Sequence, residues 1–265
     1  MVSHYSPSVP TNDLQLAQHL VAEGRRVVLL TGAGISTASG IPDYRGPDGV
    51  WTKNPGAEVR AHIDVWMSDI EVRRAGWQRR ANMSWEAVQP NAAHHAITDF
   101  SQRGILDVVV TQNIDGLHQK AGLTGERLIE IHGTVHESLC MRCDARGPIE
   151  LILHRVEAGD TDPRCEAMSG GSHCGGIVKA ATISFGQSLI LDDLNRAERA
   201  ARECDVFLAA GSTLGVYPIA AIVPVAKRAG AKIIIANGSP TEMDGLADVV
   251  VSGDLTDTLP VILAG

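Results

Sequence analysis

Short, almost wholly apolar runs recur along this chain, and each is followed directly by glycine or by polar residues. Runs of this kind are typical of strands that are buried on both faces of a parallel sheet. Segments with a helical spacing of apolar residues stand between them, so we expect an α/β fold with a doubly wound parallel sheet. The expected strands are residues 27–31, 107–111, 128–131, 205–210, 232–236 and 248–251.

Two stretches interrupt this alternation. Residues 57–89 are rich in Arg and Trp and are expected to be mostly helical, and residues 139–177 hold four of the five cysteines. We interpret both as insertions that form a small domain. Residues 1–10 are expected to be a loose tail, and the sheet domain then comprises residues 11–56, 90–138 and 178–265.

The composition excludes several classes of protein. The chain has 265 residues, of which 44% are apolar and 20% charged, as in a globular protein rather than a disordered one. The net charge is -8 and no dense Lys/Arg run occurs, so nucleic acid is not expected as a partner. The most apolar long stretch, Val216 to Ala226, contains two prolines and is too short to span a membrane. We also find no secretory signal and expect a cytoplasmic protein.

The cysteines are spaced in pairs. Cys140-x-x-Cys143 is followed about twenty residues later by Cys165 and Cys174, which eight residues separate. In a reducing compartment such pairs favour a closed, tetrahedral four-thiolate zinc site with a structural role. Disulfides or free thiols are the alternatives. Cys204 stands alone before an expected strand and is expected to lie in the core.

The first expected strand runs straight into a glycine-containing turn, residues 32–36 (Gly-Ala-Gly-Ile-Ser). Glycines there let the backbone approach a pyrophosphate, although an ordinary tight turn has the same sequence character. Thr37 replaces the third glycine of the usual dinucleotide fingerprint, and Lys53 and Asn54 stand where an acidic residue is expected. This departure argues against a hydride-transferring dehydrogenase.

Polar clusters follow four of the expected strands, at residues 111–115, 132–133, 211–213 and 237–239. Because the carboxyl ends of parallel strands share one edge of the sheet, these clusters should converge beside the glycine turn. Each cluster could instead cap the next helix. His132 is a candidate general base because its ordinary pKa lies near neutrality, although a single histidine at a strand end is more often structural.

The order of these motifs resembles that of sirtuins, and most closely that of the bacterial members. The resemblance extends from about Val27 to Pro260 and rests on six motifs: residues 32–36, Ser-Gly-Ile-Pro-Asp-Tyr-Arg at 39–45, Thr-Gln-Asn-Ile-Asp at 111–115, His-Gly at 132–133, the four cysteines, and Gly-Ser-Thr-Leu at 211–214. It implies a Rossmann-like NAD-binding domain with a small domain built from a zinc ribbon and helices. It also implies an enzyme that uses NAD to remove acyl groups from protein lysines, with nicotinamide and an O-acyl-ADP-ribose as the other products.

The resemblance implies roles for individual residues. His132 matches the catalytic base, and Asn113 and Asp115 match nicotinamide-pocket residues that take part in catalysis. The residues implied to bind the cofactor are Gly32, Ala33, Gly34, Ser36, Asp43, Tyr44, Arg45, Gln112, Asn113, Ile114, Asp115, Gly211, Ser212, Thr213, Asn237 and Leu255. Zn²⁺ would be held by Cys140, Cys143, Cys165 and Cys174.

The partners implied by the resemblance are acyl-lysine proteins or peptides, bound as an added strand between the two domains. The matching residues are Phe185, Gly186 and Val216. Relatives that prefer acidic acyl groups carry a Tyr-x-x-Arg pair where this chain has Trp77-x-x-Arg80. Because the tyrosine hydroxyl is missing, we expect acetyl-lysine as the substrate, with Trp77 and Arg80 near the acyl group.

Three other functions compete with deacylation. Mono-ADP-ribosyl transfer to protein uses the same cleavage of NAD with a different acceptor. A non-enzymatic module would only sense NAD, but the joint presence of His132, Asn113 and Asp115 disfavours it. A nicotinamide-dependent dehydrogenase is disfavoured by the broken glycine fingerprint.

Overall fold

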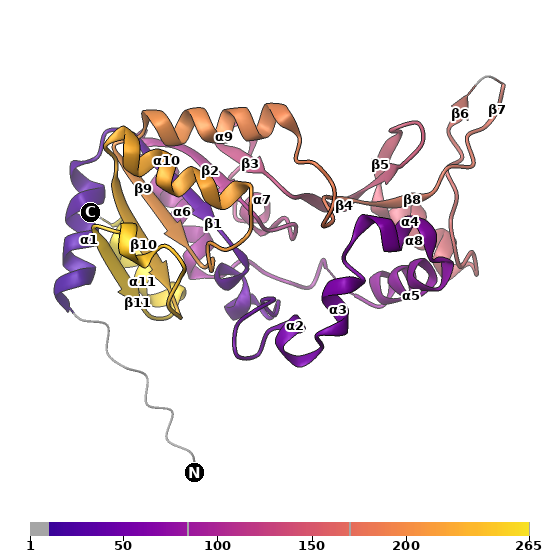
Figure 1. The fold of residues 1–265 in the computed structure, drawn as a ribbon, viewed down its shortest axis with the longest axis horizontal. Coiled ribbons are helices and arrows are strands. Elements are labelled where there is room, and N and C mark those ends of the chain that lie inside the picture. Colours follow the sequence, from indigo (N-terminus) through magenta and orange to yellow (C-terminus); the bar gives the residue numbers. More distant parts are fainter. Residues whose placement is uncertain (1–10, 84, 170, 265) are drawn as a thin grey trace, which may run out of the picture.

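Six parallel strands form the sheet of the larger domain in the computed structural model, which describes residues 11–83, 85–169 and 171–264 (Figure 1). Their order across the sheet is β11-β10-β9-β1-β2-β3. The expected α/β fold is therefore confirmed, and no strand end differs from its expected position by more than one residue. The strands are β1 (Val27–Thr31), β2 (Leu106–Thr111), β3 (Leu128–Glu130), β9 (Val206–Ala210), β10 (Lys232–Asn237) and β11 (Val249–Ser252).

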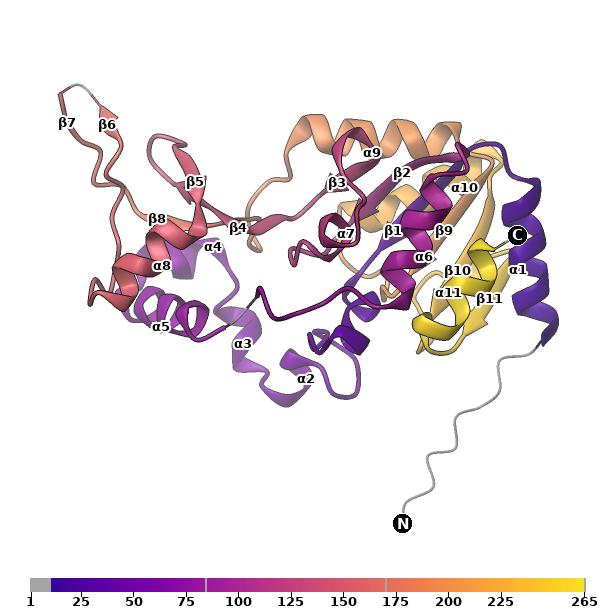
Figure 2. The ribbon, with the colours of Figure 1, turned by 180° about the vertical axis from the view of Figure 1, so that it is seen from behind.

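Helices cover both faces of this sheet. All five residues of β1 are buried; Val27 and Leu29 join the apolar core on one face, and Val28 and Leu30 join the core on the other. The first face packs against α1 (Thr11–Glu23), α6 (Ala92–Ser101) and α11 (Leu255–Leu263), which lie in front in Figure 2. The second face packs against α9 (Leu191–Glu203) and α10 (Ile222–Ala229), which lie in front in Figure 1.

The chain reverses its direction of travel across the sheet between β1 and β9. Counted along the chain, the strands stand in the order 3-2-1-4-5-6, so the connections leaving β1 and β9 diverge. Ligands of such sheets bind in the crevice at this switch point, beyond the carboxyl ends of the strands. The short elements of the large domain are η1 (Ala33–Ile35), η2 (Thr37–Ser39), α2 (Val50–Lys53), α7 (Leu117–Lys120), η3 (Gly125–Arg127), η4 (Ile219–Ala221) and η5 (Asp244–Leu246).

The two expected insertions lie together at the far end of the molecule in Figure 1. Helices α4 (Ile63–Ser68) and α5 (Ile70–Ala81), which follow α3 (Gly56–Val59), pack beside the cysteine-bearing segment around a core of their own. That segment contains a three-stranded sheet of order β5-β4-β8 and a short β6–β7 hairpin. Its elements are β4 (Gly133–Cys140), β5 (Arg146–Pro148), α8 (Ile149–Glu157), β6 (Met168–Ser169), β7 (Ser172–His173) and β8 (Val178–Thr182). The second insertion is therefore wider than residues 139–177.

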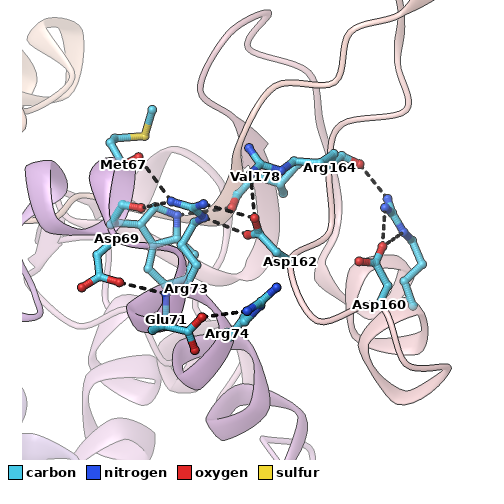
Figure 3. Close-up of polar contacts among 11 residues, drawn as sticks. Met67, Asp69, Glu71, Arg73, Arg74, Asp160, Asp162, Arg164 and Val178 are labelled. Carbon is cyan, nitrogen blue, oxygen red and sulfur yellow. Dashed lines mark hydrogen bonds and ion pairs between the residues drawn. The ribbon is translucent and has the colours of Figure 1, made fainter.

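A buried ion pair joins the two insertions (Figure 3). The Arg73 guanidinium on α5 binds the Asp162 carboxylate through contacts of 2.8 and 3.1 Å, and these side chains are only 5% and 10% exposed. Arg73 also donates to the Trp66 and Met67 carbonyls at 2.9 and 3.2 Å, at the end of α4. One arginine thus fixes the end of α4 against the loop that leads to Cys165.

The expected tail, residues 1–10, lies outside the described residues. Within the described part of the chain, no helix is long and apolar enough to cross a membrane.

Candidate functional site

The glycine turn packs against the loop that follows β9. A Cβ on Gly34 would lie 2.8 Å from Gly211 Cα, and one on Gly32 would lie 2.7 Å from the Gly211 carbonyl oxygen. The Gly34 amide donates to this same carbonyl at 2.8 Å. Gly211 itself has a φ of +69°, a conformation that favours glycine. Glycine is therefore required here so that two loops meet at the switch point, and the Gly34 N–H is already engaged.

Three residues expected to bind the cofactor, Ser36, Asn113 and Asp115, form one buried hydrogen-bonded group. Ser36 Oγ donates to Asp115 Oδ2 at 2.7 Å, and Asn113 Nδ2 donates to Ser36 Oγ at 3.1 Å. The Leu117 amide donates to the other carboxylate oxygen at 2.9 Å. Because these side chains come from the loops after β1 and β2, the sheet edge brings them together as the sequence predicted.

His132 lies directly after β3 with one ring nitrogen engaged. Its Nδ1 is 3.1 Å from the Gln112 carbonyl oxygen. A carbonyl only accepts, so Nδ1 carries the proton and Nε2 keeps its lone pair. Burial lowers the pKa of His132, an effect that the hydrogen bond with Gln112 opposes. The imidazole is therefore neutral at pH 7 and suited to accept a proton.

The Gln112 side chain connects the histidine region to the opposite side of the crevice. Its Nε2 donates to Ser212 Oγ at 2.9 Å, and Ser212 Oγ accepts from the Leu214 amide at 3.2 Å. Asn237 Nδ2 donates to the Ser239 carbonyl at 2.7 Å. These residues, expected on the adenosine side, follow β9 and β10, while Leu255 is buried at 5% exposure beneath Gly211.

A loop between the turn and α2 carries three further expected cofactor residues. Asp43 Oδ1 accepts from the Gly46 amide at 3.0 Å, so its carboxylate shapes the loop. Tyr44 is 41% exposed overall, yet its hydroxyl reaches a depth at which burial raises its pKa. The Arg45 guanidinium lies over the Trp51 ring, 4.5 Å from its centroid, and 3.5 Å from Glu58.

The expected substrate residues fall into two groups. Phe185 forms a bridge with His62, and Gly186 has a φ of +83°. Trp77, however, is fully buried and packs edge-on against Trp66 at 5.6 Å between centroids. Because no surface of Trp77 faces the cleft, the expectation that it contacts the acyl group is corrected: it is a core residue of the small domain.

Arg80 and Lys179 are two cations on the small domain that lie near each other. Burial lowers the pKa of Arg80 to about 10. Burial and the nearby Arg80 lower the pKa of Lys179 to about 7, and the Lys179 ammonium contacts the Thr182 carbonyl. The burial of a charged side chain at residue 179 is a feature that only the structure reveals.

A second layer under the site was not foreseen. His118 Nε2 lies 3.0 Å from Thr31 Oγ1, and Thr31 Oγ1 donates to Thr111 Oγ1 at 2.9 Å. Thr111 Oγ1 in turn accepts from the Asn113 amide at 3.1 Å. Burial, followed by the neighbouring His94, lowers the pKa of His118 to about 3. No spacing pattern marks His118, so the sequence carried no signal for it.

Asn91 also supports the glycine turn, although no motif in the sequence singled it out. Its side chain caps α6 and also donates to the Ile35 carbonyl at 2.8 Å and to Ser39 Oγ at 2.9 Å. Asparagine directly before a helical run of apolar residues is a common helix cap, but the contact of Asn91 with the glycine turn is visible only in the fold.

The four paired cysteines lie close enough to hold one metal ion. Their sulfur atoms all lie within 4.8 Å of one another. Cys140 and Cys174 are 3.7 Å apart, as are Cys143 and Cys165, and a tetrahedron with Zn–S bonds of about 2.3 Å requires about 3.8 Å. A Cβ on Gly176 would lie 2.7 Å from Cys140 Sγ, so the knuckle needs this glycine. The donor set fits Zn²⁺, and four thiolates leave no position for a substrate.

Comparison with known proteins decides the family. The sequence model described as "Sir2 family" matches residues 32–218, more than half of the chain. The chain belongs to the Sir2 family.

Two Sir2 relatives match nearly the whole chain. "NAD-dependent protein deacetylase 2" of Streptomyces coelicolor is 43% identical over 90% of this chain and 97% of its own. "NAD-dependent protein deacetylase 1" of Bradyrhizobium diazoefficiens is 39% identical over 91% of each chain.

Solved Sir2 structures share the fold. One, described as "Structural Basis for the Mechanism and Regulation of Sir2 Enzymes", superposes with a TM-score of 0.84 at 36% identity and covers 96% of this chain and 98% of its own. Another, "Sir2 bound to acetylated peptide", has a TM-score of 0.81 at 29% identity and covers 95% and 97%. These likenesses extend over both domains and therefore support one family for the whole chain.

Proposed function

We propose that this protein is an NAD-dependent protein-lysine deacetylase that releases nicotinamide and an O-acyl-ADP-ribose. The observation that carries the proposal is the crevice itself. His132, a neutral histidine with a free Nε2, bonds the carbonyl of Gln112, whose neighbour in the chain, Asn113, belongs to the buried Ser36–Asn113–Asp115 group. The names of the relatives, and of a Sir2 structure described with 3'-O-acetyl ADP ribose, support the same reaction.

The family scheme assigns a part to each group. The acyl oxygen attacks the anomeric carbon of the nicotinamide ribose, and the bond to nicotinamide breaks. His132 Nε2 then takes a proton from a ribose hydroxyl, whose oxygen attacks the resulting imidate carbon. Water completes the release of the free lysine. A base with a lowered pKa suits this step because it is unprotonated at pH 7.

The geometry supports the remaining proposed roles. The Ser36–Asn113–Asp115 group offers amide and carboxylate atoms to a carboxamide such as that of nicotinamide. Zinc, when bound to the four thiolates, stabilises the small domain and takes no part in the chemistry. Four reduced thiols at metal-binding distance also support a reducing compartment, such as the cytoplasm. Acetyl-lysine is the proposed substrate.

The test is a stoichiometric assay. An acetyl-lysine peptide, NAD and enzyme should yield nicotinamide and deacetylated peptide in equal amounts. His132→Ala should lower the rate by about 10²- to 10⁴-fold, the usual contribution of a general base. His19→Ala, at an exposed position on α1, is the matched control and should keep full activity. Equal rates for the two variants would refute the assignment of the base.

Labelled NAD separates deacylation from mono-ADP-ribosyl transfer. Label recovered in a small acyl ester supports deacylation, and label retained on protein supports transfer. The names of the relatives favour the first outcome. A panel of acetyl, succinyl and longer acyl-lysine peptides, compared by kcat/KM, tests the acyl preference.

A further inference from the structure

Four aromatic rings form a row beside the crevice. The ring centroids of Tyr44 and Trp51 are 4.7 Å apart, those of Trp51 and Phe185 are 5.5 Å apart, and those of Phe185 and His62 are 5.5 Å apart. The interplanar angles are 42°, 54° and 33°. Tilted pairs at these separations attract one another beyond the burial of their surfaces. The row is therefore a continuous series of contacts between segments far apart in the sequence.

Both the backbone and the side chain of Trp51 are bound to the loop that carries Asp43, Tyr44 and Arg45, so Trp51 moves with this loop. Its amide donates to the Tyr44 carbonyl at 2.9 Å, and the Val50 amide donates to the Asp43 carbonyl at 2.8 Å. The Arg45 guanidinium lies over the Trp51 ring at 4.5 Å, a distance typical of a cation–π contact. A displacement of Tyr44 or Arg45 therefore displaces the indole.

Phe185 belongs to the opposite wall. Its amide donates to the Ala61 carbonyl at 3.1 Å, and its carbonyl accepts from the Ile63 amide at 2.9 Å, so it is paired with the chain that enters α4. The proposed peptide site includes Phe185, and the proposed cofactor site includes Tyr44 and Arg45. Trp51 contacts members of both sets.

We propose that Trp51 is a positioning residue that couples binding at the acyl-peptide site to binding at the NAD site. The inference rests on the proposed function. Peptide bound against Phe185 fixes the indole, and the fixed indole holds Tyr44 and Arg45 over the cofactor. Linkage then requires that NAD raise the affinity for peptide by the same factor.

The test measures this coupling without turnover. The Kd of an acetyl-lysine peptide is measured by calorimetry alone and at saturating carba-NAD, in which a methylene replaces the oxygen of the nicotinamide ribose and cleavage is blocked. The ratio of the two Kd values is the coupling factor. We expect about 5-fold or more in the native protein, the lower end of common coupling energies.

Trp51→Ala should reduce the coupling factor to less than about 2-fold, and Trp51→Phe should keep most of it because a ring remains between Tyr44 and Phe185. Val50→Ala is the matched control, since Val50 lies on the same short helix outside the row and should leave the factor unchanged. Thermal melting of each variant checks that the fold is kept.

The possible outcomes distinguish the role of Trp51 from the deacetylase proposal. A native coupling factor near 1, or one that Trp51→Ala leaves unchanged while both ligands bind, overturns the role of Trp51 and leaves the deacetylase proposal intact. Failure of the native protein to bind either ligand overturns both proposals. Loss of coupling in Trp51→Ala, with recovery in Trp51→Phe, supports the role.

Discussion

Removal of the Arg73 guanidinium should destabilise the small domain selectively. In Arg73→Met, the Asp162 carboxylate loses contacts of 2.8 and 3.1 Å, and two carbonyls at the end of α4 lose their donor. Breaking a buried pair from one side typically costs about 3–5 kcal/mol. Asp162 keeps a contact of 2.6 Å with the partly exposed Arg164, so we expect the lower end, about 3 kcal/mol.

That loss corresponds to a fall in Tm on the order of 10 °C, at about 2–4 °C per kcal/mol for a chain of this size. The small domain has its own core, in which Trp66 and Trp77 pack together, so tryptophan fluorescence should report its unfolding before circular dichroism reports loss of the large domain. Zinc release to a chromophoric chelator should coincide with the fluorescence change.

The neighbouring residue offers the control. Arg74 pairs with Glu71 at the surface, where the side chains are 44% and 73% exposed, and Arg74→Met should cost less than about 0.5 kcal/mol. Arg73→Met combined with Asp162→Leu should recover part of the loss, because no unpaired carboxylate remains buried. A Tm for Arg73→Met within about 2 °C of that for Arg74→Met would refute the reasoning.

Three further outcomes follow from the site and the metal cluster. The deacetylation rate should fall as pH drops through a His132 pKa below its ordinary value of 6.5, because the base must be unprotonated; a pH–rate profile with its acid limb above 6.5 contradicts this. Lys179→Met should stabilise the fold most below pH 7, where the buried lysine is charged, and progressively less as the pH rises to 10.5, because the pKa of Lys179 is about 7 in the folded protein and 10.5 in the unfolded chain. A difference in Tm between Lys179→Met and the native protein that stays constant across this pH range would contradict the prediction. Cys143→Ser should reduce bound zinc, measured by atomic absorption, well below that of Cys204→Ser, whose thiol lies outside the cluster; equal zinc contents would count against the site.

The large domain was predictable because its strands are buried on both faces. All five residues of Val27–Thr31 are buried, so this strand is recognisable in the sequence as an almost wholly apolar run. The strand Gly133–Cys140 left no such run, because only some of its residues are buried and Glu137 is exposed. Val178–Thr182 contains the charged Lys179 and was equally hard to recognise.

The site was predictable where a motif fixes both residue type and loop position, as at Ser36, Asn113 and Asp115. The helical insertion was not. Arg73 and Trp77 are four residues apart on α5 and share its buried face. A helix with as many arginines as α5 is nevertheless expected to face the solvent. The sequence pattern could not reveal that Arg73 is paired inside the protein, and Trp77 was expected near the acyl group from the family motif alone.

The small domain is assembled from two lengths of chain, and this governs the order in which it can form during synthesis. Arg73 and Asp162 are separated by 89 residues, and the core that receives Trp66 and Trp77 is completed by residues near Cys174 and Val178. Closing so long a loop has an entropic cost that only late contacts offset. The two tryptophans therefore emerge from the ribosome well before their partners. Cys174 is the last of the four clustered cysteines to be synthesised, so the metal site and the core around the two tryptophans can be completed only after it has emerged.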